Sequence, residues 1–205
     1  MRPSWMLTQL GEETRHHHAF ADGDRLAIME RPSVEQYQLF LVHIYCFEEP
    51  LERAIAGTPG FDRALLRTHL KTPRLVEDLR ALDLAVDGIR SLASYRFDVP
   101  TALGWMYAVH RNTLLHGLLY RYLKAKLPTT MQAAGSYLSA FEARAGVLLR
   151  QLGDALDFTA RADRAEARIV SAANDAFRAQ RQWYGSTVMP RRPPAARPTT
   201  PRRAA

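Results

Sequence analysis

Apolar residues recur every three or four positions along most of the chain, and no stretch alternates apolar and polar residues as a half-buried strand would. Residues 33–57 show this pattern most clearly, with Ser33 and Gln36 spaced as a capping box and Gly57 as a stop signal. Pro50 lies within this stretch and predicts a kink, because proline lacks an amide proton and clashes with the preceding turn. The periodicity therefore predicts an all-α protein.

Further helices are predicted on both sides of this stretch. A helix over about residues 7–18 comes first, and residues 72–84 form a shorter amphipathic helix. Residues 99–127 are apolar on more than one side, as expected of a central, buried helix. Two more helices cover residues 129–156 and 164–185, introduced by the capping pairs Thr129 with Gln132 and Asp163 with Glu166. We expect a bundle of six to eight helices in one domain, residues 1–184.

The composition is ordinary for a soluble globular protein, with 47% hydrophobic and 24% charged residues. The longest apolar run, LFLVHIYCF, is interrupted by His43 and is too short to span a bilayer. The N-terminal sequence turns acidic before any long apolar run and makes a poor signal peptide. Cys46 is the single cysteine, so an intramolecular disulfide is excluded and a buried thiol is expected. We therefore expect a cytoplasmic protein.

Residues 185–205, GSTVMPRRPPAARPTTPRRAA, hold five arginines, five prolines and no acidic residue. Without this tail the formal charge falls from +7 to +2, so the basic balance is weak evidence for specific nucleic-acid binding. The tail has too few apolar residues to fold, and we expect a disordered extension. It could also contact RNA, a membrane surface or an acidic partner.

The sequence LGEETRHHHAF offers two kinds of metal chemistry. Glu13 and His16 have the Glu-x-x-His spacing of carboxylate-bridged di-iron sites, but a second copy of that motif is missing. A heme iron needs only one neutral imidazole delivered from a helix. Thr14 and His18 lie four residues apart and share a stripe with Leu7 and Gly11, while His16 and His17 can face solvent. The alternative is a partly buried, hydrogen-bonded histidine without a ligand.

Five motifs, in order over residues 7–184, resemble bacterial, biliverdin-producing heme oxygenases. The opening stretch matches a histidine four residues after a threonine, which puts His18 at the position of the proximal iron ligand. The other four resemblances are Tyr45-Cys46-Phe47 with Pro50-Leu51-Glu52, then Leu75 with Asp78 and Leu79, then the run ALGWMYAVHRNTLLHG, and finally AANDAFRAQRQWY.

One segment departs from the pattern of that family. Its members carry Gly-Ser-x-Leu-Gly-Gly on the distal helix, where glycines let the backbone approach the heme. Here the segment reads Arg111-Asn112-Thr113-Leu114-Leu115-His116, and the first glycine is Gly117. Bulky side chains therefore stand where the family has glycines, at the wall of the expected cavity.

The resemblance implies oxidative cleavage of heme to biliverdin, iron and carbon monoxide, using dioxygen and electrons from an external reductase. It implies that His18 is the axial ligand beside Thr14 and that Asn112 and Arg111 act on the distal side. Leu115 and His116 would line the pocket, and Arg15, Arg121 and Lys124 are candidates to contact the heme propionates. Two alternatives follow from the divergent segment. In the first, His116 or His110 could ligate the iron in a bis-histidine carrier or sensor. In the second, the crowded cavity could exclude heme and leave a fold that binds a protein partner.

Overall fold

The expected all-α fold is confirmed in the computed structural model, which describes residues 3–86, 95–162 and 164–185 and has no β-strand among them. In chain order the elements are α1 (Trp5–Glu13), α2 (Arg15–Leu26), the 3₁₀ turn η1 (Ala27–Met29), α3 (Val34–Ala56), α4 (Arg63–His69), α5 (Thr72–Ala81), α6 (Val99–Arg111), the 3₁₀ turn η3 (Asn112–Leu115), α7 (His116–Lys126), α8 (Pro128–Ala134), α9 (Ser136–Glu142), α10 (Ala145–Ala162) and α11 (Glu166–Gly185).

The helix predicted most clearly, α3, begins and ends where expected. The Ser33 hydroxyl accepts a hydrogen bond from the Gln36 amide at 3.2 Å, and the helix stops just before Gly57. Pro50 lies inside it. Cys46 is buried, as expected, and burial raises the pKa of its thiol to about 11.

Three of the expected helices are divided, so the chain has more and shorter helices than the sequence predicts. The first is interrupted at Thr14, residues 99–127 are interrupted by η3, and residues 129–156 form α8, α9 and α10. Thr129 does not cap a helix, because α8 starts at Pro128, whose fixed φ suits a first turn. The short helix α4 is unpredicted and is capped by Asp62. Asp163 and the tail after Gly185 lie outside the described residues.

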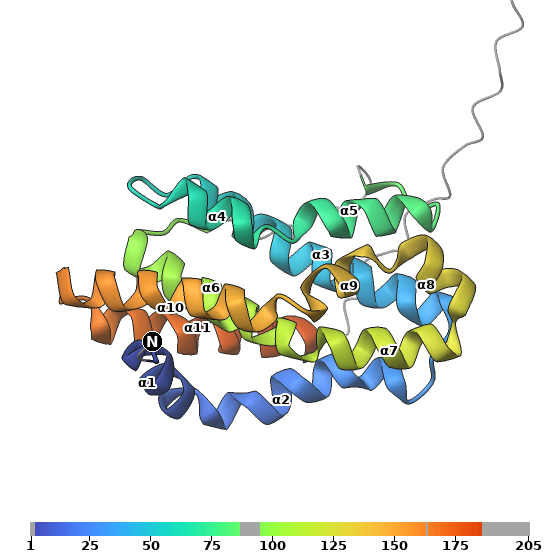
Figure 1. Ribbon diagram of the computed structural model, residues 1–205, viewed down its shortest axis with the longest axis horizontal. Helices are drawn as coiled ribbons and strands as arrows, with labels where there is room; N and C mark the ends of the chain where they lie inside the picture. Colours follow the sequence, from blue (N-terminus) through green and yellow to red (C-terminus); the bar gives the residue numbers. More distant parts are fainter. Residues whose placement is uncertain (1–2, 87–94, 163, 186–205) are drawn as a thin grey trace, which may run out of the picture.

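The bundle places α1 and α2 along one edge and α4 and α5 along the opposite edge, with α6, α10 and α11 between them (Figure 1). Two hydrophobic clusters form the core, and α3 contributes to both. Its first half packs with α5, α7, α8 and α9, whereas its second half packs with α1, α6, α10 and α11. The change of cluster falls between Cys46 and Phe47.

The central helix α6 packs closely on α11 at Gly104. A Cβ atom at this position would lie 2.4 Å from the Ile169 carbonyl oxygen and 2.8 Å from the Ala172 Cβ. The missing side chain therefore sets the distance between the two helices, and α6 in turn positions η3.

No helix in the described part of the chain is both long enough and apolar enough to cross a membrane.

Candidate functional site

His18 lies on α2, half-buried, one helical turn after Thr14. The buried Thr14 hydroxyl donates to the Leu10 carbonyl at 2.6 Å and lies 3.0 Å from Nε2 of His18. Because that hydroxyl has a single proton, the geometry places a proton on Nε2 and leaves the lone pair on Nδ1. Burial first and the Arg111 charge second lower the pKa of His18 to about 4. The imidazole is therefore neutral at physiological pH.

The other two histidines of the triplet have different environments. His16 is exposed, as expected, but the expectation that His17 faces solvent is wrong. The His17 ring stacks on Phe177 with 5.5 Å between centroids, and its Nε2 lies 3.1 Å from the Asn174 amide oxygen. The break at Thr14 separates α1 from α2, so a single helical wheel drawn through both does not describe the faces of α2.

Arg111, at the end of α6, forms a bidentate ion pair with Asp22 of α2. Its Nη2 lies 2.9 Å from Asp22 Oδ2, and Nη1 contacts Oδ1. The side chains are 16% and 29% exposed, respectively. Asp22 follows His18 by four residues, so the two lie on the same side of α2. The pair joins α2 to the junction of α6 and η3 beside His18. Asp22 was not among the residues singled out from the sequence, although this spacing was a usable signal.

Asn112 begins η3 and is directed into the protein. Its Nδ2 donates to Gln180 Oε1 of α11 at 2.9 Å, and both side chains are about 1% exposed. The next residue, Thr113, donates its hydroxyl proton to the His110 carbonyl at 2.7 Å. Such local hydrogen bonds compete with the α-helical pattern and accompany the 3₁₀ turn.

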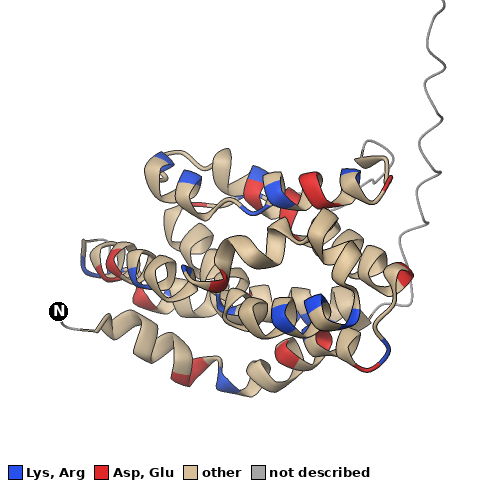
Figure 2. Ribbon diagram, turned by 45° about the vertical axis from the view of Figure 1, so that its right-hand side comes forward, with Lys and Arg blue, Asp and Glu red and all other residues tan. Residues whose placement is uncertain are grey.

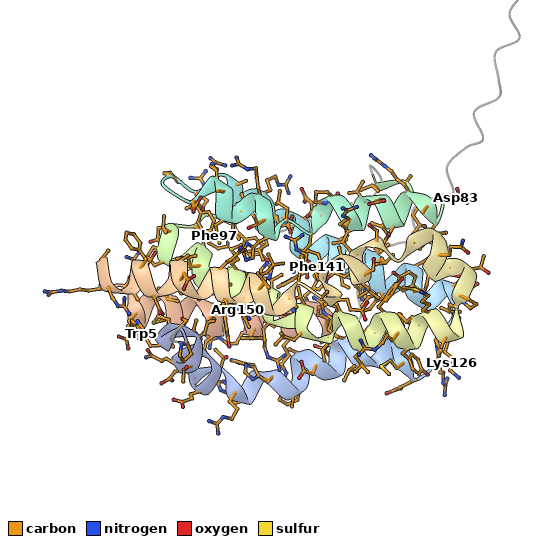
Figure 3. The ribbon with its side chains drawn as sticks, in the orientation of Figure 1. Trp5, Asp83, Phe97, Lys126, Phe141 and Arg150 are labelled. Atoms are coloured by element: carbon orange, nitrogen blue, oxygen red, sulfur yellow. The ribbon has the colours of Figure 1, made fainter. Side chains whose placement is uncertain are left out.

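His116 is 1% exposed and faces α9, where its ring centroid lies 4.6 Å from that of Tyr137 and 5.7 Å from that of Phe141. Phe141 lies near the middle of the molecule (Figure 3). His110 is buried next to His69, 4.4 Å between ring centroids. The ring nitrogens of His110 and His116 make no hydrogen bond of good geometry within the described residues. Burial keeps the pKa of both rings well below the usual value. Their neighbours differ from those of His18, which has Thr14 and Phe177 beside it.

The remaining predicted site residues do not form one group, since they belong to α2, η3 and α7. Leu115 packs on the cluster that contains α7 and α9, and Arg15 is exposed at the start of α2. Arg121 pairs with Glu142 of α9 at 2.8 Å, and the Lys124 ammonium lies 5.6 Å from the centroid of Tyr120. Basic residues form bands along α7 (Figure 2). The structure therefore brings together Thr14, His18 and Arg111, but not the other predicted residues.

A buried group of charged side chains also went unrecognised in the sequence. Glu48 of α3 is fully buried and lies 3.0 Å from Nη2 of Arg25 and 3.0 Å from Nζ of Lys71. Tyr137 donates its hydroxyl proton to Glu48 at 3.4 Å. The usable signal was a glutamate on the apolar stripe of α3, flanked by Ile44 and Leu51.

Three or more histidine, cysteine or carboxylate side chains do not gather into a metal-binding group anywhere in the described ranges. Glu13 and His16 are both exposed and lie in different helices. The di-iron alternative therefore has no ligand set within those ranges.

The described elements define an all-α helical-bundle protein in which α2 presents the His18 imidazole beside the end of α6. Residues 4–185 match the heme oxygenase family, and the chain belongs to that family. No curated protein and no solved structure matches the sequence.

The residue types beside α2 fit a heme, and in this structure their polar atoms contact one another. His18 is neutral and half-buried, as an axial ligand must be before it binds iron. However, Thr14 holds its Nε2, and the Arg111–Asp22 pair joins α2 to the start of η3. The donor is therefore present, with its Nε2 held by Thr14 and the Arg111–Asp22 pair one turn further along α2.

Proposed function

We propose that this protein binds heme between α2 and η3 with His18 as the axial ligand, and that it degrades heme as bacterial, biliverdin-producing heme oxygenases do. The observation that carries the proposal is the neutral, half-buried imidazole of His18, held on α2 beside a cationic side chain. Family membership supports the same chemistry. In this proposal the protein is cytoplasmic and receives electrons from an external reductase.

Bound heme would be both cofactor and substrate: its iron activates dioxygen, and its ring is opened to biliverdin with release of iron and carbon monoxide. The protein supplies position and surroundings. Without heme, Thr14 holds Nε2 of His18, and Phe177 lies beside the imidazole with 5.7 Å between ring centroids. Arg111 provides a positive charge at the proposed heme site between α2 and η3, which we call the slot. A propionate carboxylate would bind favourably there. The polar pair Asn112–Gln180 fixes η3 on α11.

A second function is favoured by the residues of η3 and α7. Leu115 and His116 stand where the family resemblance predicts glycine. Their side chains would keep the backbone from approaching the heme as closely as glycine allows. The alternative is a carrier or sensor, which binds heme through His18 without degrading it. In this structure His116 packs on α9 rather than beside His18, so a bis-histidine version requires a rearrangement of α7.

The first test is titration of the purified protein with hemin, followed in the Soret region. We expect a saturable Soret band for the wild-type protein and a loss of affinity of at least about tenfold for His18→Ala, because removing a metal ligand costs more than removing its support. His16→Ala is the matched control, because His16 is exposed and lies two positions from His18. This variant should bind hemin as the wild type does. Equal affinities of the two variants would refute the assignment of His18.

Turnover separates the two candidate functions. The hemin complex is treated with ascorbate or with a reductase and its electron donor, in the presence of dioxygen. Loss of the Soret band with appearance of a biliverdin absorption supports an oxygenase. A Soret band that persists under both reductants supports the carrier or sensor.

A further inference from the structure

The Arg111–Asp22 ion pair is unusual among the ion pairs of this protein because it joins two elements that must flank a bound heme. Asp22 belongs to α2, which carries His18, and Arg111 directly precedes η3. Three of the other ion pairs, Arg53–Glu49, Arg74–Glu77 and Arg178–Asp175, lie within single helices. The Arg111–Asp22 pair thus holds the two walls of the proposed slot together.

The Arg111–Asp22 contact is strong enough to hold α2 against the end of α6, and it is exposed enough for another carboxylate to replace Asp22. Two parallel N–H···O contacts between guanidinium and carboxylate give both directionality and a stronger bond than a single charged contact. At 16% and 29% exposure, neither side chain is sealed from water. Another carboxylate that reaches the slot could therefore take the place of Asp22 on Arg111.

We propose that the Arg111–Asp22 pair is a latch that keeps the slot closed until a carboxylate of heme replaces Asp22 on Arg111. The proposal rests on heme binding at His18. It makes Arg111 a binding residue for the ligand carboxylate and Asp22 a competitor for the same guanidinium. Opening also gives the His18 ring room to turn from Thr14, since its Nε2 is occupied while the slot is closed.

The latch lowers the fraction of molecules that are open, and the apparent affinity falls in proportion to that fraction. Asp22→Asn removes the competing charge and leaves Arg111 for the ligand. Arg111→Gln also opens the slot but removes the partner of the ligand carboxylate. Both variants should therefore bind hemin faster, and Asp22→Asn should bind it more tightly than Arg111→Gln does.

The experiment measures hemin association by stopped flow, hemin affinity by Soret titration, and thermal unfolding of the ligand-free protein. For Asp22→Asn we expect association about tenfold faster and a Kd about tenfold lower than in the wild type, the scale of one lost charge-assisted contact. The ligand-free variant should unfold about 2–4 °C lower, because the closed form has lost that contact. Asp175→Asn is the matched control, since it breaks the exposed Arg178–Asp175 pair on α11.

Hemin dimethyl ester, which has no free carboxylates, tests the exchange step. It should bind the wild type more weakly than hemin does, and this difference should shrink in Arg111→Gln.

The outcomes separate the latch from the proposed function. If the wild type binds hemin through His18 and the Asp22 and Arg111 variants bind it at the same rate as Asp175→Asn, the latch is overturned and heme binding stands. If Asp22→Asn leaves the unfolding temperature unchanged, the pair does not stabilise the closed form, and the latch is overturned as well. If none of these proteins binds hemin, both proposals fall. Binding by Asp22→Asn alone supports the latch but contradicts heme binding by the wild-type protein.

Discussion

The imidazole of His116 is the clearest case of a single buried group that makes stability depend on pH. Packed on Tyr137 and Phe141, it stays neutral in the folded protein because burial keeps its pKa well below 6.5. In the unfolded chain the same group takes up a proton below about pH 6.5. The unfolded state therefore binds more protons in acid, and the stability falls as the pH falls.

His116→Phe should remove the part of this pH dependence that His116 contributes. Between pH 7.5 and 5.5 the wild type should lose about 1.4 kcal/mol of unfolding free energy that the variant keeps, the contribution of one histidine that titrates only when unfolded. Urea denaturation at both pH values measures the difference. His16→Phe is the control, since His16 is exposed. If His116→Phe and the wild type lose equal stability, the ring is not held neutral by its burial.

Residue spacing gave a useful but incomplete account of the histidine triplet. The Thr14–His18 spacing predicted that these residues share a side, and Thr14 indeed lies 3.0 Å from His18 Nε2. The burial of His17 was not predictable from the triplet, because it depends on Phe177 and Asn174, about 160 residues away. The family resemblance implies a distal role for Arg111, whereas its ion pair with Asp22 depends on the docking of α2 on the end of α6.

At the scale of elements, the contact of α6 with α11 fixes where η3 lies. Gly104→Ala would bring a Cβ within 3 Å of backbone and Cβ atoms of α11, which cannot move without shifting the helix. We expect a loss of about 1–3 kcal/mol in unfolding free energy, the usual cost of overpacking. The same variant should weaken hemin binding, because displacement of α6 moves Arg111.

Gly23→Ala is the matched control for that prediction. Gly23 is an exposed glycine within α2, and no neighbouring atom lies within 4 Å of the position that a Cβ would take there. Alanine should stabilise the helix at this position by about 0.5–1 kcal/mol. Denaturant titration of both variants measures the contrast, and a Gly104→Ala protein as stable as the wild type would contradict the close packing.

The helix breaks coincide with hydrogen bonds that periodicity does not register. The apolar pattern continues through residues 112–115, so residues 99–127 read as one helix. The Asn112 amide turns instead to Gln180, and Thr113 bonds to the His110 carbonyl. At the junction of α8 and α9, the backbone amides of Ser136 and Tyr137 donate to Asp78 of α5 at 2.9 and 2.8 Å. Hydrogen bonds to Gln180 and Asp78, on other elements, thus accompany both breaks.

At the scale of the whole molecule, Glu48 lies where α3 passes from one hydrophobic cluster to the other. Its carboxylate holds two buried cations, Arg25 and Lys71, which come from α2 and from the residue just before α5. Glu48→Gln would leave both cations without this negative partner in the core. We expect a loss of about 3–5 kcal/mol in unfolding free energy, the cost of breaking a buried ion pair. Because burial already lowers the pKa of Lys71, deprotonation of this lysine would bring the loss toward the lower value.

Glu49→Gln provides the comparison for this substitution. Glu49 is the next residue, but its partner Arg53 is 65% exposed, so its loss should cost no more than about 1 kcal/mol. Chemical denaturation of the two variants measures the contrast. Similar stabilities for Glu48→Gln and Glu49→Gln would show that the buried carboxylate is not needed to neutralise the two cations.

The sequence by itself determined the helical class, the limits of α3, the burial of Cys46 and the family, because these depend on periodicity, capping residues and motifs that are local in the chain. The tertiary structure decided which way the polar side chains turn. Asp22, His17 and Glu48 acquire their environments from residues on other helices, and a one-dimensional pattern does not specify which helix faces which. The Arg111–Asp22 ion pair is such a property, since it joins residues that lie 89 positions apart in the chain.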